Sequence, residues 1–371
     1  MSHRNNKPAV IFLGKLPPPW IGPAMAAKVI LSSSLNDNFR LIHLDLSDHR
    51  DTHTLGRWDF TNIWLALKQY CRLVWLILRH RPALVYIPAG QTTVGYLRDA
   101  VFIMISKVFG RKVICHLRGG NFLNWYKGTS SLMRSIVRFV HSKVDAQIVL
   151  ADNLRPLFNW IIPEERIFTI PNGLDIPDPN RKPPAAPLHV LYLSNYIRTK
   201  GVMEVLSAAW LLRDRKEQIH FRLAGGWNEK ETESGIRKFC SDKPELNITF
   251  SGPVSGEEKE RLLLEADVFV LPTYYENEGL PWALVEAMAF RLPLVSTRHA
   301  AIPSCLAEGV NGFFVEKKDA DSLASALIRY LDDPGLIGKQ GMASRQRYEE
   351  HFTEASMIGG LRRAFTKTLE D

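Results

Sequence analysis

The stretch Thr273–Ala289 reads TYYENEGLPWALVEAMA, and the rest of the chain is best understood outward from it. The apolar run Asp267–Leu271 before it predicts a buried strand, and apolar residues after Pro281 recur at helical spacing. The start of a helix carries backbone N–H groups that favour phosphate, and Glu278 and Glu286 add two carboxylates beside it. This combination fits a ligand with both phosphate and hydroxyl groups, such as a sugar nucleotide.

Two glutamates at this spacing are, taken alone, more typical of an ordinary strand, loop and helix with solvated side chains. The complete run is more specific, because it resembles the signature of family 4 retaining glycosyltransferases, which use nucleotide sugars and have the GT-B fold. That signature is a Glu, seven residues and a second Glu, usually with G-L-P or G-F-G inside it and with E-A-M-A at its end. Glu278, Gly279, Leu280, Pro281 and Glu286–Ala289 match it.

The composition is that of a soluble globular protein of two or three domains, with 371 residues, 46% hydrophobic and 23% charged. The four cysteines are far apart and have no zinc spacing, so we expect reduced thiols in a cytoplasmic chain. The apolar run Ala9–Leu13 is too short for a signal peptide, and no apolar run reaches the length of a membrane span.

The positive charge is concentrated in the first half of the chain. Residues 1–180 hold 22 Lys and Arg against 12 Asp and Glu, whereas residues 181–371 hold 25 against 27. Such an excess indicates nucleic acid, an anionic membrane or an anionic substrate as partner. No nucleic-acid-binding motif accompanies it, which excludes the first of these from our prediction.

Apolar runs alternate with helical patterns along the chain, which predicts an α/β protein with doubly wound parallel sheets. In the first half we expect strands at Pro8–Gly14, Phe39–Leu46, Ala83–Ala89, Lys112–Leu117, Ala146–Leu150 and Ile167–Ile170. We expect helices there at Ala24–Leu35, Thr61–His80, Thr92–Phe109, Ser130–His141 and Asn153–Trp160. In the second half we expect strands at Leu188–Leu193, His220–Ala224, Ile248–Ser251, Val268–Leu271, Leu294–Ser296 and Phe313–Val315.

The Pro-rich stretch Ile176–Pro187 predicts a linker between two Rossmann-like domains. We therefore assign residues 1–175 to an N-terminal acceptor-binding domain and 188–350 to a C-terminal donor-binding domain. The resemblance implies that the two domains face each other. It also implies that residues 351–371, part of a polar helical tail from Ser344 to Leu369, cross back to the first domain.

The first half offers two candidate sites after predicted strands. Gly22, before a predicted helix, would let a diphosphate approach the backbone, although Pro23 stands where the resembling family has a second glycine. Arg118, Gly119 and Gly120 follow a strand, and the family commonly has a donor-contacting histidine where Arg118 stands. His116 lies two residues away, so we expect it on the same face, as a substitute for that histidine or as a buried core residue.

The second half offers a loop with the sequence Asn195-Tyr196-Ile197-Arg198-Thr199-Lys200-Gly201. The resembling family places an Arg and a Lys here, and both hold the diphosphate of the donor. Lys200 matches the Lys, Asn195 replaces the Arg, and Arg198 is the residue that would reach in its place. Nearby, Asn172 belongs to an N-G-x-D turn at the domain junction, for which we expect a structural role.

The resemblance assigns roles to these residues. Glu278, Lys200 and Arg118 are the catalytic candidates; Glu286, Gly279, Leu280, Pro281, Gly22, Arg198 and Asn195 are donor-binding candidates; and His116, Gly119 and Gly120 are acceptor-side candidates. No cofactor and no metal are expected. Asp319 and Asp321 form an Asp-x-Asp pair, but they precede a helical pattern, Ser322–Leu331, where an Asp acts as a cap.

Two basic helical patterns remain. Lys68, Arg72 and Arg79 share one stripe, and Arg134, Arg138 and His141 share another. A solvated face is the simpler interpretation, and docking to an anionic membrane that carries a lipid-linked acceptor is the alternative.

We therefore expect a retaining glycosyltransferase of surface polysaccharide or glycoconjugate synthesis, located in the cytoplasm or peripherally on the inner face of a membrane. A sugar-nucleotide epimerase of the same fold and a turnover-deficient sugar-nucleotide-binding protein are the alternatives. Arg118 and Asn195 differ from the residues that the family commonly has at these positions, and these differences are compatible with a binding protein that has lost turnover.

Overall fold

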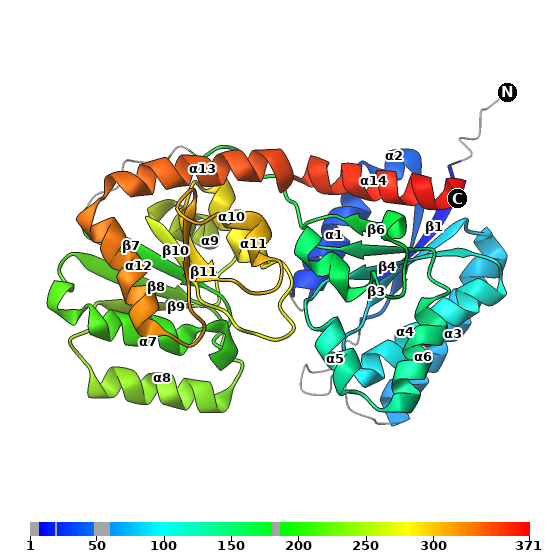
Figure 1. Ribbon diagram of the computed structural model, residues 1–371, viewed down its shortest axis with the longest axis horizontal. Helices are drawn as coiled ribbons and strands as arrows, with labels where there is room; N and C mark the ends of the chain where they lie inside the picture. The colour runs from blue at the N-terminus through cyan, green and yellow to red at the C-terminus, as the bar shows by residue number, and fades with distance from the viewer. Residues whose placement is uncertain (1–6, 19–20, 48–59, 180, 182–185) are drawn as a thin grey trace. The chain divides into compact units, whose positions relative to one another are not determined.

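The computed structural model describes residues 7–18, 21–47, 60–179, 181 and 186–371. Its contacts divide the chain into two compact units, Met1–Asn172 with Glu354–Asp371, and Gly173–Thr353. Each unit contains one six-stranded sheet covered by helices (Figure 1). All the pairings between neighbouring strands are parallel, so the expected α/β class with two doubly wound sheets is confirmed. The predicted linker lies partly outside the described residues.

The first sheet has the strand order β2-β1-β3-β4-β5-β6. Its strands are β1 (Ala9–Gly14), β2 (Arg40–Asp45), β3 (Leu84–Ala89), β4 (Lys112–Leu117), β5 (Ala146–Val149) and β6 (Ile167–Thr169). Val10 of β1 lies opposite Leu41 of β2 on one side and Leu84 of β3 on the other. The central strands are buried on both faces, which explains why they are continuous apolar runs.

Helices cover both faces of the first sheet. They are α1 (Gly22–Ser32), α2 (Leu35–Asn38), α3 (Phe60–His80), α4 (Thr93–Val108), α5 (Phe122–Gly128), α6 (Ser131–His141), and the 3-10 helices η2 (Asp152–Leu157) and η3 (Glu164–Arg166). The side chains of Thr92 and Ser130 cap α4 and α6 by accepting backbone hydrogen bonds. The α-helix expected at Asn153–Trp160 is wrong, because η2 contains Pro156, which lacks the N–H that an α-helix interior requires.

The second sheet has the order β12-β11-β10-β7-β8-β9. Its strands are β7 (Leu188–Leu193), β8 (Ile219–Ala224), β9 (Ile248–Gly252), β10 (Val268–Leu271), β11 (Leu294–Thr297) and β12 (Gly312–Val315). Its helices are η4 (Arg198–Lys200), α7 (Val202–Leu211), η5 (Arg213–Arg215), α8 (Lys230–Asp242), α9 (Gly256–Glu265), α10 (Trp282–Ala289), α11 (Ile302–Cys305), α12 (Ala320–Asp332) and α13 (Gly335–His351).

The C-terminal tail forms two helices where the sequence predicts one. Helix α13 ends at His351, and α14 (Glu354–Glu370) belongs to the first unit. Leu361 and Phe365 of α14 lie in one apolar cluster with Phe12 of β1 and Tyr86 of β3, and Figure 1 shows the helix beside α2. The expected return of the last helix to the first domain is therefore confirmed.

Among the described residues, no helix combines the length and the apolar character needed to cross a membrane.

Candidate functional site

The second sheet has a topological switch point between β7 and β10. The chain passes from β7 to β8 and β9 on one side, and then returns to place β10 on the other side of β7. Ligands of open parallel sheets bind at such a point, outside the carboxyl ends of the strands. The loops that leave β7 and β10 there are residues 194–201 and 272–281, which contain the two motifs that the sequence singles out.

An ion pair joins these two loops. Nζ of Lys200 lies 2.5 Å from Oε2 of Glu278, and the two side chains are only 15% and 8% exposed. The same carboxylate oxygen accepts a hydrogen bond of 3.1 Å from the hydroxyl of Thr273, and Nζ of Lys200 lies 4.8 Å from the ring centre of Tyr275. The structure thus brings together two predicted site residues that are 78 positions apart.

Close backbone packing holds the two loops against each other. The amide of Tyr274 donates a 2.8 Å hydrogen bond to the carbonyl of Thr199. Gly201 has a φ of +85°, and a Cβ at this position would lie 2.5 Å from the carbonyl oxygen of Pro272. Only glycine fits both the left-handed backbone and this close approach, so Gly201 is needed to place Lys200 beside Glu278.

Helix α10 begins directly after the second loop. Pro281 is its N-cap, with a φ of −61° and a ψ of 126°, so the helix begins one residue later than Pro281. The side chain of Pro281 itself makes no capping hydrogen bond to this helix start. Leu280 and Pro281 are buried, and the carbonyl of Gly279 accepts a 3.2 Å hydrogen bond from Ala301. The loop before α10 is therefore held firmly by its surroundings.

Glu286, the second glutamate of the motif, is buried in α10 and forms its own ion pair. Its Oε1 lies 2.6 Å from Nζ of Lys259 on α9. The sequence analysis missed Lys259, because the segment GEEKERLLLE has the pattern of an ordinary surface helix. Only the packing of α9 against the sheet reveals that this lysine reaches the motif.

Asn195 and Arg198 lie in the same loop as Lys200, but they make different contacts. Oδ1 of Asn195 accepts a 3.2 Å hydrogen bond from the amide of Gly226, which ties this loop to the turn after β8. Arg198 has an exposed side chain, and its backbone amide donates a 2.9 Å hydrogen bond to Glu229. The structure thus gives Asn195 a contact that orders the loop.

His299 is a further residue at this edge. Its Nδ1 accepts from Nζ of Lys317 at 3.0 Å, so Nε2 carries the proton and donates to the carbonyl of Tyr275 at 2.7 Å. Burial lowers the pKa of His299, and the nearby Lys317 and Lys200 lower it further. A neutral imidazole therefore anchors the loop that carries Tyr275 and Glu278.

The first unit holds a separate polar network at the carboxyl end of β4. Arg118 donates to Oδ1 of Asn172 at 2.8 Å and to the Tyr86 hydroxyl at 3.2 Å. Tyr86 in turn lies 2.7 Å from Nδ1 of His116. Because Arg118 donates to the Tyr86 oxygen, the Tyr86 hydroxyl donates to Nδ1, and the His116 proton sits on Nε2.

The network is electrically neutral apart from Arg118. Burial lowers the pKa of His116 well below its usual range, and it raises the pKa of Tyr86. Nε2 of His116 is buried and has no hydrogen-bond partner among the described residues. The expectation that His116 and Arg118 lie on one face is confirmed, since both contact Tyr86.

The remaining glycine candidates also belong to the first unit. Gly119 is buried and Gly120 is half-buried, and both lie between β4 and α5. Gly22 is half-buried and is the first residue of α1, which begins two residues before the expected start at Ala24, and Ile21 is the N-cap.

Asp319 has a structural role in the second unit. Its Oδ1 accepts a 2.9 Å hydrogen bond from the amide of Ser322, so it caps α12. In the described ranges, no three His, Cys, Asp or Glu side chains form a group that could hold a metal ion.

The fold and this site define the class of protein that the chain resembles. Along 99% of its length, the structure superimposes on a complete glycosyltransferase structure from Rickettsia africae with a TM-score of 0.79 at 13% identity. It also superimposes on the complete chain of Anabaena HepE in complex with UDP-glucose, with a TM-score of 0.71 at 15% identity over 97% of this chain. The fold is therefore GT-B.

The sequence of the second unit is more informative than the fold. Residues 178–350 match the family model of the glycosyl transferases group 1. An amylovoran biosynthesis glycosyltransferase from Erwinia amylovora is 29% identical over 173 residues, which are 45% of this chain and 42% of that protein. The chain spans about half the length of the curated relatives that it matches here.

Proposed function

We propose that the chain is a retaining glycosyltransferase that moves a sugar from a nucleoside-diphosphate sugar to a saccharide or lipid-linked acceptor. The observation that carries this proposal is the largely buried ion pair between Lys200 and Glu278 at the switch point, in the loops that lead to the start of α10. The family match of residues 178–350 and the UDP-glucose bound to Anabaena HepE support it. The name of the Erwinia relative supports a place in surface polysaccharide synthesis.

In the proposed complex, Lys200 and the backbone N–H groups at the start of α10, together with Gly279, Leu280 and Pro281, hold the donor diphosphate. Glu286 accepts hydrogen bonds from the ribose hydroxyls, and Glu278 accepts them from the hydroxyls of the transferred sugar. The Lys200 ammonium then has two anionic partners, which share it. Because Glu278 already neutralises Lys200 in the structure, the site needs no unpaired buried charge before the donor binds.

The proposed chemistry breaks the bond between the anomeric carbon and the phosphate oxygen, whose electron pair stays on the diphosphate. The acceptor hydroxyl forms the new bond on the same face, and its proton passes to the departing diphosphate oxygen. Lys200 stabilises the negative charge that develops there, and such preorganised stabilisation is commonly the largest catalytic contribution. No metal or other cofactor is needed in this scheme.

The first unit supplies the acceptor side of the proposal. Arg118, held in place by Asn172 and Tyr86, offers a permanent positive charge for a phosphate or carboxylate of a substrate. Gly119 and Gly120 lie next to Arg118 on this side, His116 supports the network from beneath, and Gly22 at the start of α1 is proposed to contact the donor diphosphate. Asn195 and Arg198 complete the donor side. We place the protein in the cytoplasm, and its relation to a membrane is a separate proposal argued below.

A two-stage experiment tests this function. Thermal unfolding with a panel of UDP-, GDP- and ADP-sugars first identifies the donor, since a ligand that binds only the folded state raises the melting temperature. Release of the nucleoside diphosphate is then measured with and without saccharide or lipid-linked acceptors. Release that depends on the acceptor supports transfer, isomerised donor without acceptor indicates an epimerase, and stabilisation without turnover indicates a binding protein.

Two substitutions link the activity to the site. Lys200→Ala and Glu286→Ala are each expected to lower kcat/KM by about 100-fold to 1,000-fold. Lys238→Ala, an exposed lysine on α8, is the matched control and should retain full activity. Circular dichroism confirms that each variant is folded, and full activity in a folded Lys200→Ala or Glu286→Ala protein would refute the assignment.

A further inference from the structure

Helix α3 of the first unit has two apolar faces, only one of which is buried. Leu73, Leu76 and Ile77 are at most 4% exposed and pack into the unit. On the opposite side, Trp64 and Trp75 are 69% and 58% exposed. At about 100° per residue, the exposed stripe lies diametrically opposite the buried one. A helix of a soluble domain normally places polar residues there, so the exposed apolar stripe needs an explanation.

Basic residues border this stripe. Lys68, Arg72 and Arg79 are exposed and lie along one side of it, at the spacing of successive helical turns. The sequence of α3 contains no Asp or Glu, and neither does that of α6. The single acid of α4, Asp99, is buried and paired with Arg98 at 2.7 Å. This part of the molecule is therefore both apolar and cationic.

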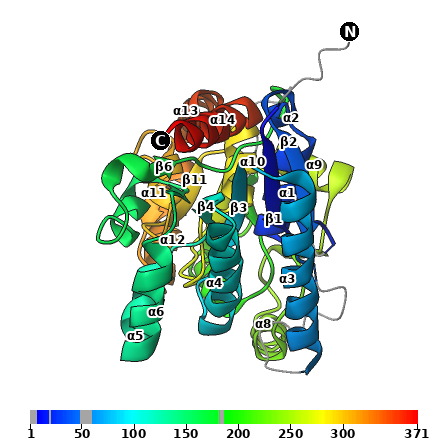
Figure 2. The ribbon, with the colours of Figure 1, turned by 90° about the vertical axis from the view of Figure 1, so that its right-hand side faces the viewer.

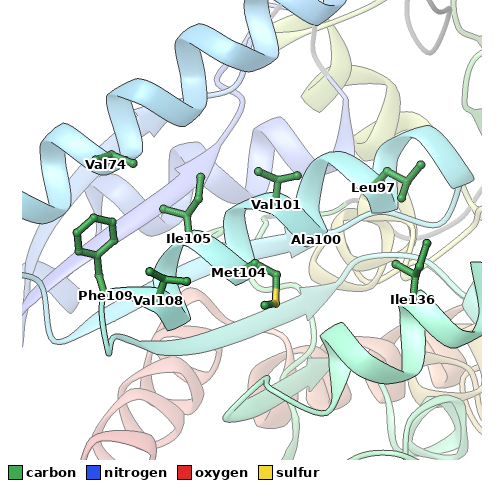
Figure 3. Close-up of a pocket in the computed structure, with 9 residues that line it drawn as sticks. All are labelled: Val74, Leu97, Ala100, Val101, Met104, Ile105, Val108, Phe109 and Ile136. Carbon is green, nitrogen blue, oxygen red and sulfur yellow. The ribbon is translucent and has the colours of Figure 1, made fainter.

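The apolar surface continues from α3 across α4 to α6. These helices contact one another in sequence, and Figure 2 shows them side by side. Between them lies an open groove of about 430 Å³, and its nine lining residues, which Figure 3 labels, are all apolar. Val108 of α4 is 78% exposed, and Leu132 and Phe139 of α6 are 73% and 57% exposed. We call this surface, formed by the exposed residues of α3, α4 and α6, the three-helix face.

We propose that the three-helix face binds the surface of an anionic lipid bilayer, with its apolar side chains in the interface and Lys68, Arg72 and Arg79 on lipid phosphates. Exposed tryptophans beside Lys and Arg are the composition that favours this interface. Contiguous exposed apolar surface marks an interaction site in a soluble protein. A face with basic residues and without accessible carboxylates also binds anionic lipid favourably, because no like charge repels the lipid phosphates.

A second copy of the chain is a less favourable occupant. In a symmetric dimer formed by this face, the same surface meets itself, so a basic face without accessible carboxylates would meet another basic face. Like charges brought together in this way disfavour association. Nucleic acid would satisfy the basic residues but would leave Trp64, Trp75 and Leu132 without apolar partners.

The face extends to the end of the sheet that carries Arg118. In a parallel α/β unit, a helix that follows a strand begins at the carboxyl end of that strand. Trp64 and Leu132 lie near the starts of α3 and α6, at this end. A membrane on the three-helix face would therefore bring a lipid-linked acceptor to the edge where Arg118 lies. The binding itself involves only the first unit and does not depend on the proposed transfer reaction.

Sedimentation with vesicles tests the proposal, using the purified chain without donor or acceptor. We expect binding to vesicles of phosphatidylcholine with phosphatidylglycerol, and at least tenfold weaker binding to pure phosphatidylcholine, since each surface Lys or Arg contributes about 1 kcal/mol. We also expect 0.5 M NaCl to release part of the bound protein from the vesicles, because salt screens the attraction between the basic side chains and the anionic lipid.

Substitutions of exposed residues locate the surface. The triple variant Lys68→Gln, Arg72→Gln and Arg79→Gln should bind anionic vesicles about 100-fold more weakly. The double variant Trp64→Ser and Trp75→Ser should bind at least about tenfold more weakly, because two apolar side chains are lost from the interface. Lys230→Gln with Lys238→Gln, and Met342→Ser, whose side chain is 68% exposed in the second unit, are the matched controls and should bind normally.

A thiol label gives a second readout. Cys71 is exposed in the middle of the α3 stripe, whereas Cys115 and Cys305 are buried. In a Cys240→Ser background, an environment-sensitive dye on Cys71 should shift to shorter wavelength with anionic vesicles. Four results would each overturn the proposal. They are an emission of the dye that does not shift, equal binding to neutral and anionic vesicles, unchanged binding of the triple variant, and no binding to vesicles, whether or not the protein forms a dimer.

Discussion

The two sheets place polar groups at their carboxyl edges in opposite ways. In the second unit the edge holds ion pairs, Lys200 with Glu278 and Lys259 with Glu286, which are partly accessible to solvent. In the first unit it holds Tyr86 and His116, which are neutral, buried and hydrogen-bonded to each other beneath Arg118. Ion pairs suit an edge at which a bound anion can share the lysine with the protein carboxylate, whereas a neutral network suits an edge that holds one side chain in place.

The largest expected effect comes from a substitution in the backbone of the second unit, at the carboxyl edge of its sheet. A Cβ on Gly225 would overlap the carbonyl oxygen of Ser194, so Gly225→Ala should destabilise the protein by more than about 4 kcal/mol or prevent folding. Urea unfolding of the purified variant measures this. Gly235→Ala, in α8 where nothing lies within 4 Å of the added methyl group, should instead stabilise by about 0.5 to 1 kcal/mol.

The next effect tests whether the interior of the first unit is neutral. Burial lowers the pKa of His141 from its usual 6.5 to about 4. The free energy of unfolding should therefore be unaffected by this residue above pH 6.5, and it should fall as the pH drops toward 4, because only the unfolded chain takes up the proton. The expected loss is about 3 kcal/mol, from about 1.4 kcal/mol per pH unit.

The variant His141→Gln isolates this contribution. The expected place of His141 on a basic surface face is wrong, because the side chain is buried. It faces Tyr96 and Gln147, with hydrogen bonds of 3.2 and 3.1 Å, and among the described residues no charged group is hydrogen-bonded to it. Urea unfolding at several values between pH 7.5 and 4 should show a shallower fall for the variant. Parallel curves for the wild type and the variant would contradict the assignment.

A smaller effect is expected from opening the neutral network. Tyr86→Phe removes the hydroxyl that links Arg118 to His116 and leaves Nδ1 of His116 buried without a donor. The expected loss of stability is about 1 to 3 kcal/mol. Tyr70→Phe is the matched control, because the hydroxyl of the half-buried Tyr70 makes only a long bond of 3.4 Å, and should cost about 0.5 kcal/mol or less. Equal losses in the two variants would count against a special role for the network.

The smallest expected effect is on donor binding, and it tests the role of Lys259. In the proposed reaction, Lys259 orients Glu286 toward the ribose, so Lys259→Ala should weaken donor binding about threefold to tenfold, the value of an ordinary hydrogen bond. The KM for the donor should rise while kcat stays nearly constant. Arg261→Ala, on the same helix with a 63% exposed side chain, is the control and should leave both constants unchanged.

Local patterns predict the fold well and the site only in part. Every predicted strand is present, and its ends fall within one residue of the expected positions, because buried parallel strands are short apolar runs. Lys200 and Glu278 each stand in a recognisable motif, but nothing in the sequence indicates that they pair with each other. Tyr86 lies inside an apolar strand and has the pattern of an ordinary core residue, so the network around Arg118 was not predictable.

Two other misses have the same origin. Lys259 reaches Glu286 only because of the orientation in which α9 packs against the sheet, and the local sequence does not determine that orientation. Asn172 was interpreted as part of a turn, yet its side chain also holds Arg118. Contacts between residues far apart in the chain depend on tertiary packing, and hydrophobic periodicity does not encode them.

Because α14 supplies Leu361 and Phe365 to the core around Phe12, the first unit is assembled from both ends of the polypeptide. Truncation of residues 354–371, which removes α14, would therefore uncover the interior of the N-terminal lobe rather than trim its periphery. Chimaeras that exchange this lobe between related chains would need to carry the matching C-terminal helix with it, and natural variation in the two segments should be correlated.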